Sequence, residues 1–160
     1  MKKLLLTVGI LLAVALVACG ETEDYETQIY PASSYSEYWY GLQISVAKDS
    51  VTPTGLQLVM SNASTYNYFS HGTPFFVERY RNGIWLPVPF ETREPSWSWI
   101  LIGVPPSTAT KEEVDWQHIH GELPTGRYRI VRNFILGNWD KMHGNLPHRN
   151  LYVEFLISSL

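Results

Sequence analysis

The histidines are the first residues to test for chemistry, because neutral imidazole is the commonest protein ligand of transition metals. His118 and His120 would share one face of a strand, and His143 in a later loop could fold beside them. Asp115 and Asp140 could complete such a site. The sequence has no HExxH motif and no paired cysteines, and a His-x-His pair at a turn is usually a solvated polar tip. We therefore expect no metal and no other cofactor, with these three histidines as the alternative ligand set.

Catalytic groups in familiar arrangements are absent from the sequence. It contains no GxSxG nucleophile elbow and no phosphate-binding Walker A or GxGxxG loop. The carboxylates of Glu112, Glu113 and Glu122 fall at expected strand edges and turns, and nothing singles out a glycosidase pair among them. We predict that the protein is not an enzyme, and an unrecognised hydrolase is the catalytic alternative.

Trp97 and Trp99 are the candidate ligand-binding pair. Alternation with Ser98 would place both indole rings on one side of a strand, where exposed parallel rings could stack on a sugar or on peptide aromatics. The alternative is that both rings belong to the core, because tryptophan is highly buried on average and a half-buried strand shows the same alternation. Solvent exposure of the two rings decides between these interpretations. Three other aromatic residues are assigned to the core, namely Trp85, Trp116 and Tyr128.

The amino terminus has the pattern of an export signal. Lys2 and Lys3 precede an uncharged run over residues 4–17, which is shorter than the roughly 20 apolar residues of a membrane-spanning helix. The segment Leu16-Val17-Ala18-Cys19 resembles the lipobox of bacterial lipoproteins. This resemblance implies a signal peptide over residues 1–18 and lipid, such as palmitate, on Cys19. It also implies attachment to the cell membrane or outer membrane with the domain facing outside the cytoplasm. A free thiol or half of an intermolecular disulfide is the alternative for this lone cysteine.

Composition predicts one folded domain behind this anchor. The chain has 160 residues, of which 45% are hydrophobic and 17% charged, and its net charge of −3 is not that of a nucleic-acid-binding protein. Residues 19–36 are expected to be the lipidated cysteine and a flexible tether, and residues 37–160 the folded domain. As an alternative, Tyr25, Ile29, Tyr30 and Tyr35 could let part of the tether pack as an edge strand.

Short apolar-alternating runs separated by Gly, Pro, Asn and Ser predict an all-β fold. Asn82-Gly83 favours a type I′ two-residue turn and therefore a hairpin. A single helical turn within residues 114–120 is the expected exception. The predicted strands cover residues 40–47, 55–61, 74–81, 84–90, 97–102, 110–116, 127–134 and 151–158.

The segment Leu123 to Val131 carries the clearest fold signal. Gly126 lies two residues before Tyr128, as in the tyrosine corner of Greek-key sandwiches, where the phenol binds backbone just upstream. Gly55 to Ser64, Phe76 to Arg79 and Asn82 to Pro89 come earlier in the chain. Glu113 to Trp116 and Gly121 to Ile130 follow them.

In this order, over about residues 40–157, these motifs resemble the bacterial immunoglobulin-like domains of lipoproteins and other surface proteins. The sequence departs from that pattern at residues 94–107 and 137–150. The resemblance implies an immunoglobulin-like two-sheet β-sandwich and little chemistry.

These observations predict a lipid-anchored cell-envelope protein with a non-catalytic binding or structural module. Its expected partners are the membrane, through Cys19, and an envelope protein or glycan, and not nucleic acid. One alternative is an inhibitor or accessory factor of an envelope enzyme or protease, and another is a metal- or carbohydrate-binding lipoprotein.

Overall fold

The computed structural model describes residues 35–91, 95–98, 100–137 and 146–159. The predictions made for Cys19, Trp99, Asp140 and His143 lie outside these residues. One short helix, α1 (Gln117–His120), accompanies eleven strands. The strands are β1 (Tyr35–Ser36), β2 (Tyr38–Trp39), β3 (Leu42–Val46), β4 (Gly55–Asn62), β5 (Phe69–His71), β6 (Phe76–Arg81), β7 (Ile84–Pro87), β8 (Ile102–Val104), β9 (Thr108–Asp115), β10 (Gly126–Leu136) and β11 (His148–Ile157).

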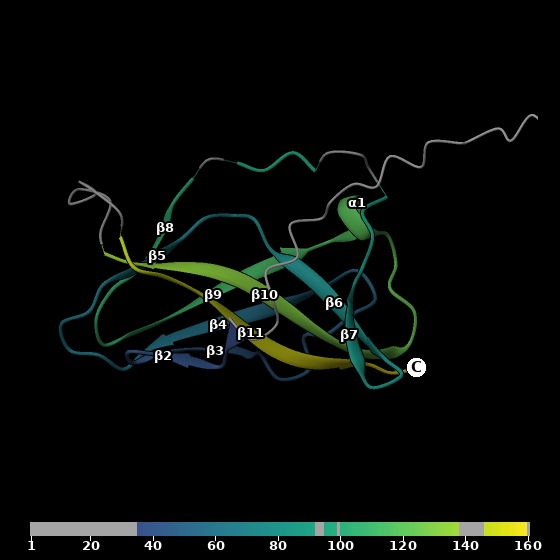
Figure 1. Cartoon of the computed structure of the whole chain (residues 1–160), viewed down its shortest axis with the longest axis horizontal. Helices are drawn as coiled ribbons and strands as arrows, with labels where there is room; N and C mark the ends of the chain where they lie inside the picture. Colours follow the sequence, from purple (N-terminus) through teal and green to yellow (C-terminus); the bar gives the residue numbers. More distant parts are fainter. Residues whose placement is uncertain (1–34, 92–94, 99, 138–145, 160) are drawn as a thin grey trace, which may run out of the picture.

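The strands form two sheets that face each other, which confirms the predicted β-sandwich (Figure 1). The smaller sheet has the order β2-β3-β4-β9. In the seven-stranded sheet, β10 pairs with β11 along one edge. The other edge of β10 pairs with β6 along its first part and with β5 along its last part. Strand β7 then pairs with β6, and β8 pairs with β5. Strand β10 is therefore the centre of the larger sheet.

The core lies between the sheets and is built from alternate residues of the strands. In β4 the side chains of Leu56, Leu58 and Met60 are buried and those between them are half-buried, as the period-two pattern predicts. The buried core comprises Trp39, Leu42, Ile44, Leu56, Leu58, Met60, Phe69, Phe75, Val77, Val104, Val114, Trp116, Leu123, Tyr128, Ile130, Phe134, Leu151, Phe155 and Ile157. Two of the three aromatic residues assigned to the core, Trp116 and Tyr128, are fully buried.

Two local predictions are confirmed in detail. Asn82 and Gly83 have φ angles of 50° and 86°, and they join β6 to β7 with Arg81 opposite Ile84, as a type I′ turn requires. The Tyr128 hydroxyl donates a 2.6 Å hydrogen bond to the carbonyl oxygen of Pro124, which is the contact of a tyrosine corner. The helical turn predicted within residues 114–120 is also present, as α1.

The strand predicted over residues 97–102 is wrong for its first part, since pairing begins only at Ile102. The carbonyl oxygen of Ser98 instead accepts a 2.7 Å hydrogen bond from the Thr73 hydroxyl. Strand β8 was predicted only at Ile102, and β1 only as the edge-strand alternative at Tyr35. Strands β2 and β5, of two and three residues, were not predicted. They are too short for alternation to be visible.

The first of these short strands bears on the tether. Tyr35 and Ser36 pair in parallel with Asn150 and Leu151 of β11. Pairing thus begins two residues before the expected start of the domain, and the edge-strand alternative holds for Tyr35. No helix among the described residues is long and apolar enough to cross a membrane.

Candidate functional site

Trp97 packs on the domain. It is half-buried, and its ring meets the buried ring of Phe75 edge-on at 5.2 Å between centroids, with an angle of 72° between the planes. Trp99 lies outside the described residues. The structure therefore describes one ring of the predicted pair, and that ring packs against the core.

His118 and His120 lie on α1 and not on the strand that would place them on one face. Residues two apart on a helix point about 200° from each other, and accordingly His118 is exposed whereas His120 is buried. The His120 Nδ1 atom is 2.9 Å from the carbonyl oxygen of Pro89, and its ring stacks on Phe90. Burial lowers the pKa of His120, and Pro89 and Glu91 oppose that shift. Within the described ranges, no three His, Cys, Asp or Glu side chains lie close enough to hold a metal ion.

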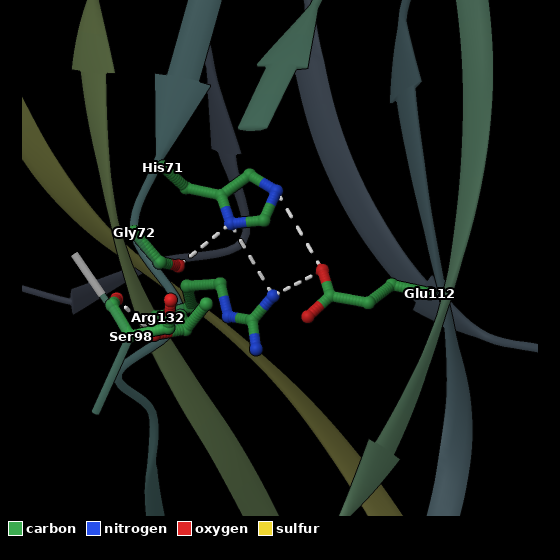
Figure 2. Close-up of polar contacts among 6 residues, drawn as sticks. His71, Gly72, Ser98, Glu112 and Arg132 are labelled. Atoms are coloured by element: carbon green, nitrogen blue, oxygen red, sulfur yellow. Dashed lines mark hydrogen bonds and ion pairs between the residues drawn. The ribbon is translucent and has the colours of Figure 1, made fainter. Parts of the chain in front are cut away.

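A different group of polar side chains meets between the sheets. His71 comes from β5, Arg132 from β10 and Glu112 from β9, so the group joins the larger sheet to the smaller one (Figure 2). Arg132 Nη1 donates to Glu112 Oε2 at 2.5 Å and lies 3.3 Å from His71 Nδ1. The His71 Nε2 atom is 3.6 Å from the same Glu112 oxygen. We call these three residues the inter-sheet latch.

Burial favours the neutral form of His71. The side chains of His71 and Arg132 are 0% and 1% exposed, and that of Glu112 is 21% exposed at the edge of the interior. Burial and, next, the Arg132 guanidinium lower the pKa of His71, against smaller opposing effects of the Gly72 carbonyl and Glu112. Histidine 71 is therefore neutral near pH 7, while Arg132 and Glu112 form the ion pair.

The neutral imidazole cannot satisfy all its neighbours. The 2.9 Å distance from His71 Nδ1 to the Gly72 carbonyl oxygen indicates that Nδ1 carries the proton and donates it there. Nδ1 then has no lone pair for Arg132, and the buried Nε2 atom has no hydrogen-bond partner. Arg132 Nε is also buried without a partner. The ion pair between Arg132 and Glu112 thus joins the two sheets. Around it, two buried nitrogen atoms of the latch have no hydrogen-bond partner.

A second buried arginine lies on the outer face of the larger sheet. Arg129 forms an ion pair with Glu78, which stands directly opposite it on β6. Three rings surround its guanidinium, with centroids 4.8, 4.6 and 5.2 Å from the Arg129 Cζ atom: those of Tyr35, Trp85 and Tyr152. The assignment of Trp85 to the core is therefore wrong. It is half-buried and covers a charge on the outer face.

Sequence reasoning missed both arginine sites. The sequence singles out Glu112 only as half of a carboxylate pair, and His71 belongs to no motif. The one available signal was that Arg127, Arg129 and Arg132 place cations at both odd and even positions of one strand. Because neighbouring residues face opposite sides of a sheet, at least one of these cations had to point toward the core.

Comparison with known proteins gives one match. Residues 39–154 match the family model described as "Bacterial Ig-like domain", and this range runs from β2 into β11. Searches of curated proteins and of solved structures found no match.

Proposed function

Because the chain belongs to the bacterial immunoglobulin-like domain family, we propose that it is a lipid-anchored protein of the cell envelope whose sandwich is a non-catalytic binding or structural module. The anchor part of this proposal rests on the lipobox-like segment Leu16-Val17-Ala18-Cys19. The family match over residues 39–154 carries the module part. It leaves the segment with Cys19 outside the domain, where an anchor would stand. Such folds host many functions, so the specific activity must come from a surface site.

The two buried ion pairs support a non-catalytic role for the domain, because their charged groups are bound to each other. Arg132 and Glu112 hold one sheet against the other, and Arg129 and Glu78 hold neighbouring strands of the larger sheet. Three of these four side chains are less than 10% exposed, which leaves little room for a substrate to reach them. Their geometry fits stabilisation of the fold.

The lipid anchor is tested by replacing the acylated atom. In the full chain expressed in a bacterial host with labelled palmitate, Cys19→Ala should abolish label incorporation and membrane retention. Cys19→Ser should do the same, because only the thiol sulfur accepts the lipid. Gly20→Ala keeps the thiol and is the matched control, which should remain in the membrane fraction. Native-level labelling of Cys19→Ala would refute the anchor.

A further inference from the structure

Three exposed tyrosines surround a shallow depression at one end of the smaller sheet. The depression has a volume of about 370 Å³, and it lies where the turn between β2 and β3 meets the loop that follows β4. Tyr38, Tyr40 and Tyr66 are 60%, 62% and 83% exposed. Gly41, Ser64 and Asn67 line the depression together with the three tyrosines.

The backbone of Tyr40 is held in an unfavourable conformation. Its φ angle is 49°, in the left-handed region that bulky residues rarely adopt. The Asn67 amide donates a 3.1 Å hydrogen bond to the Tyr40 carbonyl oxygen. Gly41 follows at φ 100°, and a Cβ there would lie 2.8 Å from the Ser64 nitrogen. Tyr40 and Gly41 form the two-residue turn between β2 and β3, which requires positive φ at both positions. The turn fixes the backbone of Tyr40, whose side chain is exposed.

Hydrogen bonds of the Asn62 and Ser64 side chains hold the loop over residues 62–67 in place. Asn62 is 2% exposed, and its amide nitrogen lies 2.8, 3.1 and 3.0 Å from the carbonyl oxygens of Asn67, Val104 and Pro105. The Asn62 side-chain oxygen accepts from the Ser64 backbone nitrogen at 3.1 Å. The Ser64 hydroxyl accepts from the backbone nitrogens of Tyr66 and Asn67. The Asn62-Ala63-Ser64 sequence thus serves to fix the loop.

The chemistry of the lining selects a class of ligand. Among the described residues, every lining side chain is uncharged, so this part of the chain offers no counter-ion to an ionic ligand in the depression. It combines aromatic faces with phenol, hydroxyl and amide groups that donate and accept hydrogen bonds. A sugar ring has the same two features, namely a face of C–H groups that stacks on aromatics and a rim of hydroxyls. Preorganised tyrosines contribute contact area at low entropic cost.

From this arrangement we propose that the depression formed by Tyr38, Tyr40 and Tyr66 binds a neutral saccharide. The inference deepens the proposed function, on which it rests, by naming the binding face and the ligand class of the module. In this proposal the aromatic rings that stack on the ligand are the tyrosines near the β2–β3 turn, and not Trp97 and Trp99.

The test uses the full chain, purified in a zwitterionic detergent without sugar headgroups, and calorimetric titration with chitotetraose, cellotetraose and mannotetraose. At least one should bind saturably. Tyr40→Ala and Tyr66→Ala should each weaken that binding about tenfold, which corresponds to the loss of one aromatic contact. Tyr80→Ala, which removes a tyrosine from β6 in the other sheet, is the matched control and should leave the affinity unchanged.

The outcomes separate the two proposals. Tyr66 is 83% exposed, so its alanine variant should fold even where Tyr40→Ala does not, and circular dichroism monitors both. Absence of binding to all three saccharides would overturn the saccharide site, as would equal binding by Tyr66→Ala and the parent, or binding of an uncharged peptide alone. Membrane retention through Cys19 is measured in a separate experiment. A failure of the saccharide site therefore leaves the proposed lipid anchor untouched, and the reverse also holds.

Discussion

Arg129 and Arg132 lie three positions apart on the same strand and are both buried, yet they are stabilised in different ways. Arg132 points between the sheets and pairs with Glu112 on the opposite sheet, beside His71. Arg129 points outward and pairs with Glu78 within its own sheet, under a cover of aromatic rings. The comparison shows that a cation on the outer face of a sandwich can be buried without a further layer of secondary structure. Aromatic side chains of the same sheet cover it instead.

The largest effect is expected from removing the acidic partners. Glu112→Gln leaves the Arg132 cation buried without a counter-charge, and the free energy of unfolding should fall by about 3 kcal/mol. Glu78→Gln should cost about 2 kcal/mol, because the rings still stabilise Arg129. Urea unfolding measures both. Glu154→Gln, in an exposed pair with Arg127, is the control and should change stability by less than about 1 kcal/mol. A larger loss for Glu78→Gln than for Glu112→Gln would reverse the comparison.

A smaller effect should come from the aromatic cover itself. Trp85→Leu removes the ring nearest to Arg129 and should lower the free energy of unfolding by about 1 to 2 kcal/mol. The loss should depend on the cation. In a double-mutant cycle with Arg129→Met, the coupling energy should be about 1 kcal/mol. A coupling energy of zero would mean that Trp85 contributes only by covering apolar surface.

Acidification should affect the inter-sheet latch through His71. Its pKa is lowered in the folded state, so below the ordinary value of about 6.5 the unfolded chain binds the proton more readily. Stability is therefore full above that pH and falls as the pH drops below it, by at most about 1.4 kcal/mol per pH unit.

The histidine responsible can be identified by substitution. His71→Gln should flatten the stability profile between pH 7.5 and 5.5, as followed by urea midpoints. The control is His118→Gln, which changes an exposed histidine and should leave the slope intact. Burial also lowers the pKa of His120, so part of the slope should remain in the His71 variant. An unchanged slope in that variant would remove His71 from the pH response.

The fold was largely predictable because its signals are local. Asn82-Gly83 dictates a hairpin by its φ angles, and Leu56, Leu58 and Met60 show the strand period directly. Tyr128 could be assigned its bond because the partner, Pro124, is four residues away. Strand β5 escaped prediction because a run of three residues has no period and only its distant partner defines it. For the same reason β1 was anticipated only as an alternative for Tyr35.

The sites were less predictable because they depend on contacts between distant segments. Glu112 and Arg132 meet across two sheets, and His71 joins them from a third strand. Trp85 was misassigned because composition favours burial of tryptophan in the core, whereas here the ring is needed over Arg129. The tyrosine depression was likewise not predictable, since Tyr38 of β2 and Tyr66 of the loop after β4 come together only in the folded domain.

The parallel pairing of β1 with β11 also sets the order in which the protein can be completed. Tyr35 and Ser36 require Asn150 and Leu151 as partners, and the hydrogen bond from Tyr152 to Glu37 spans 115 residues. Strand β1 can therefore dock only once β11 is available. Closing so long a loop carries a high entropic cost and slows folding. Docking of β1 is therefore expected late in folding, after β11 has paired with β10.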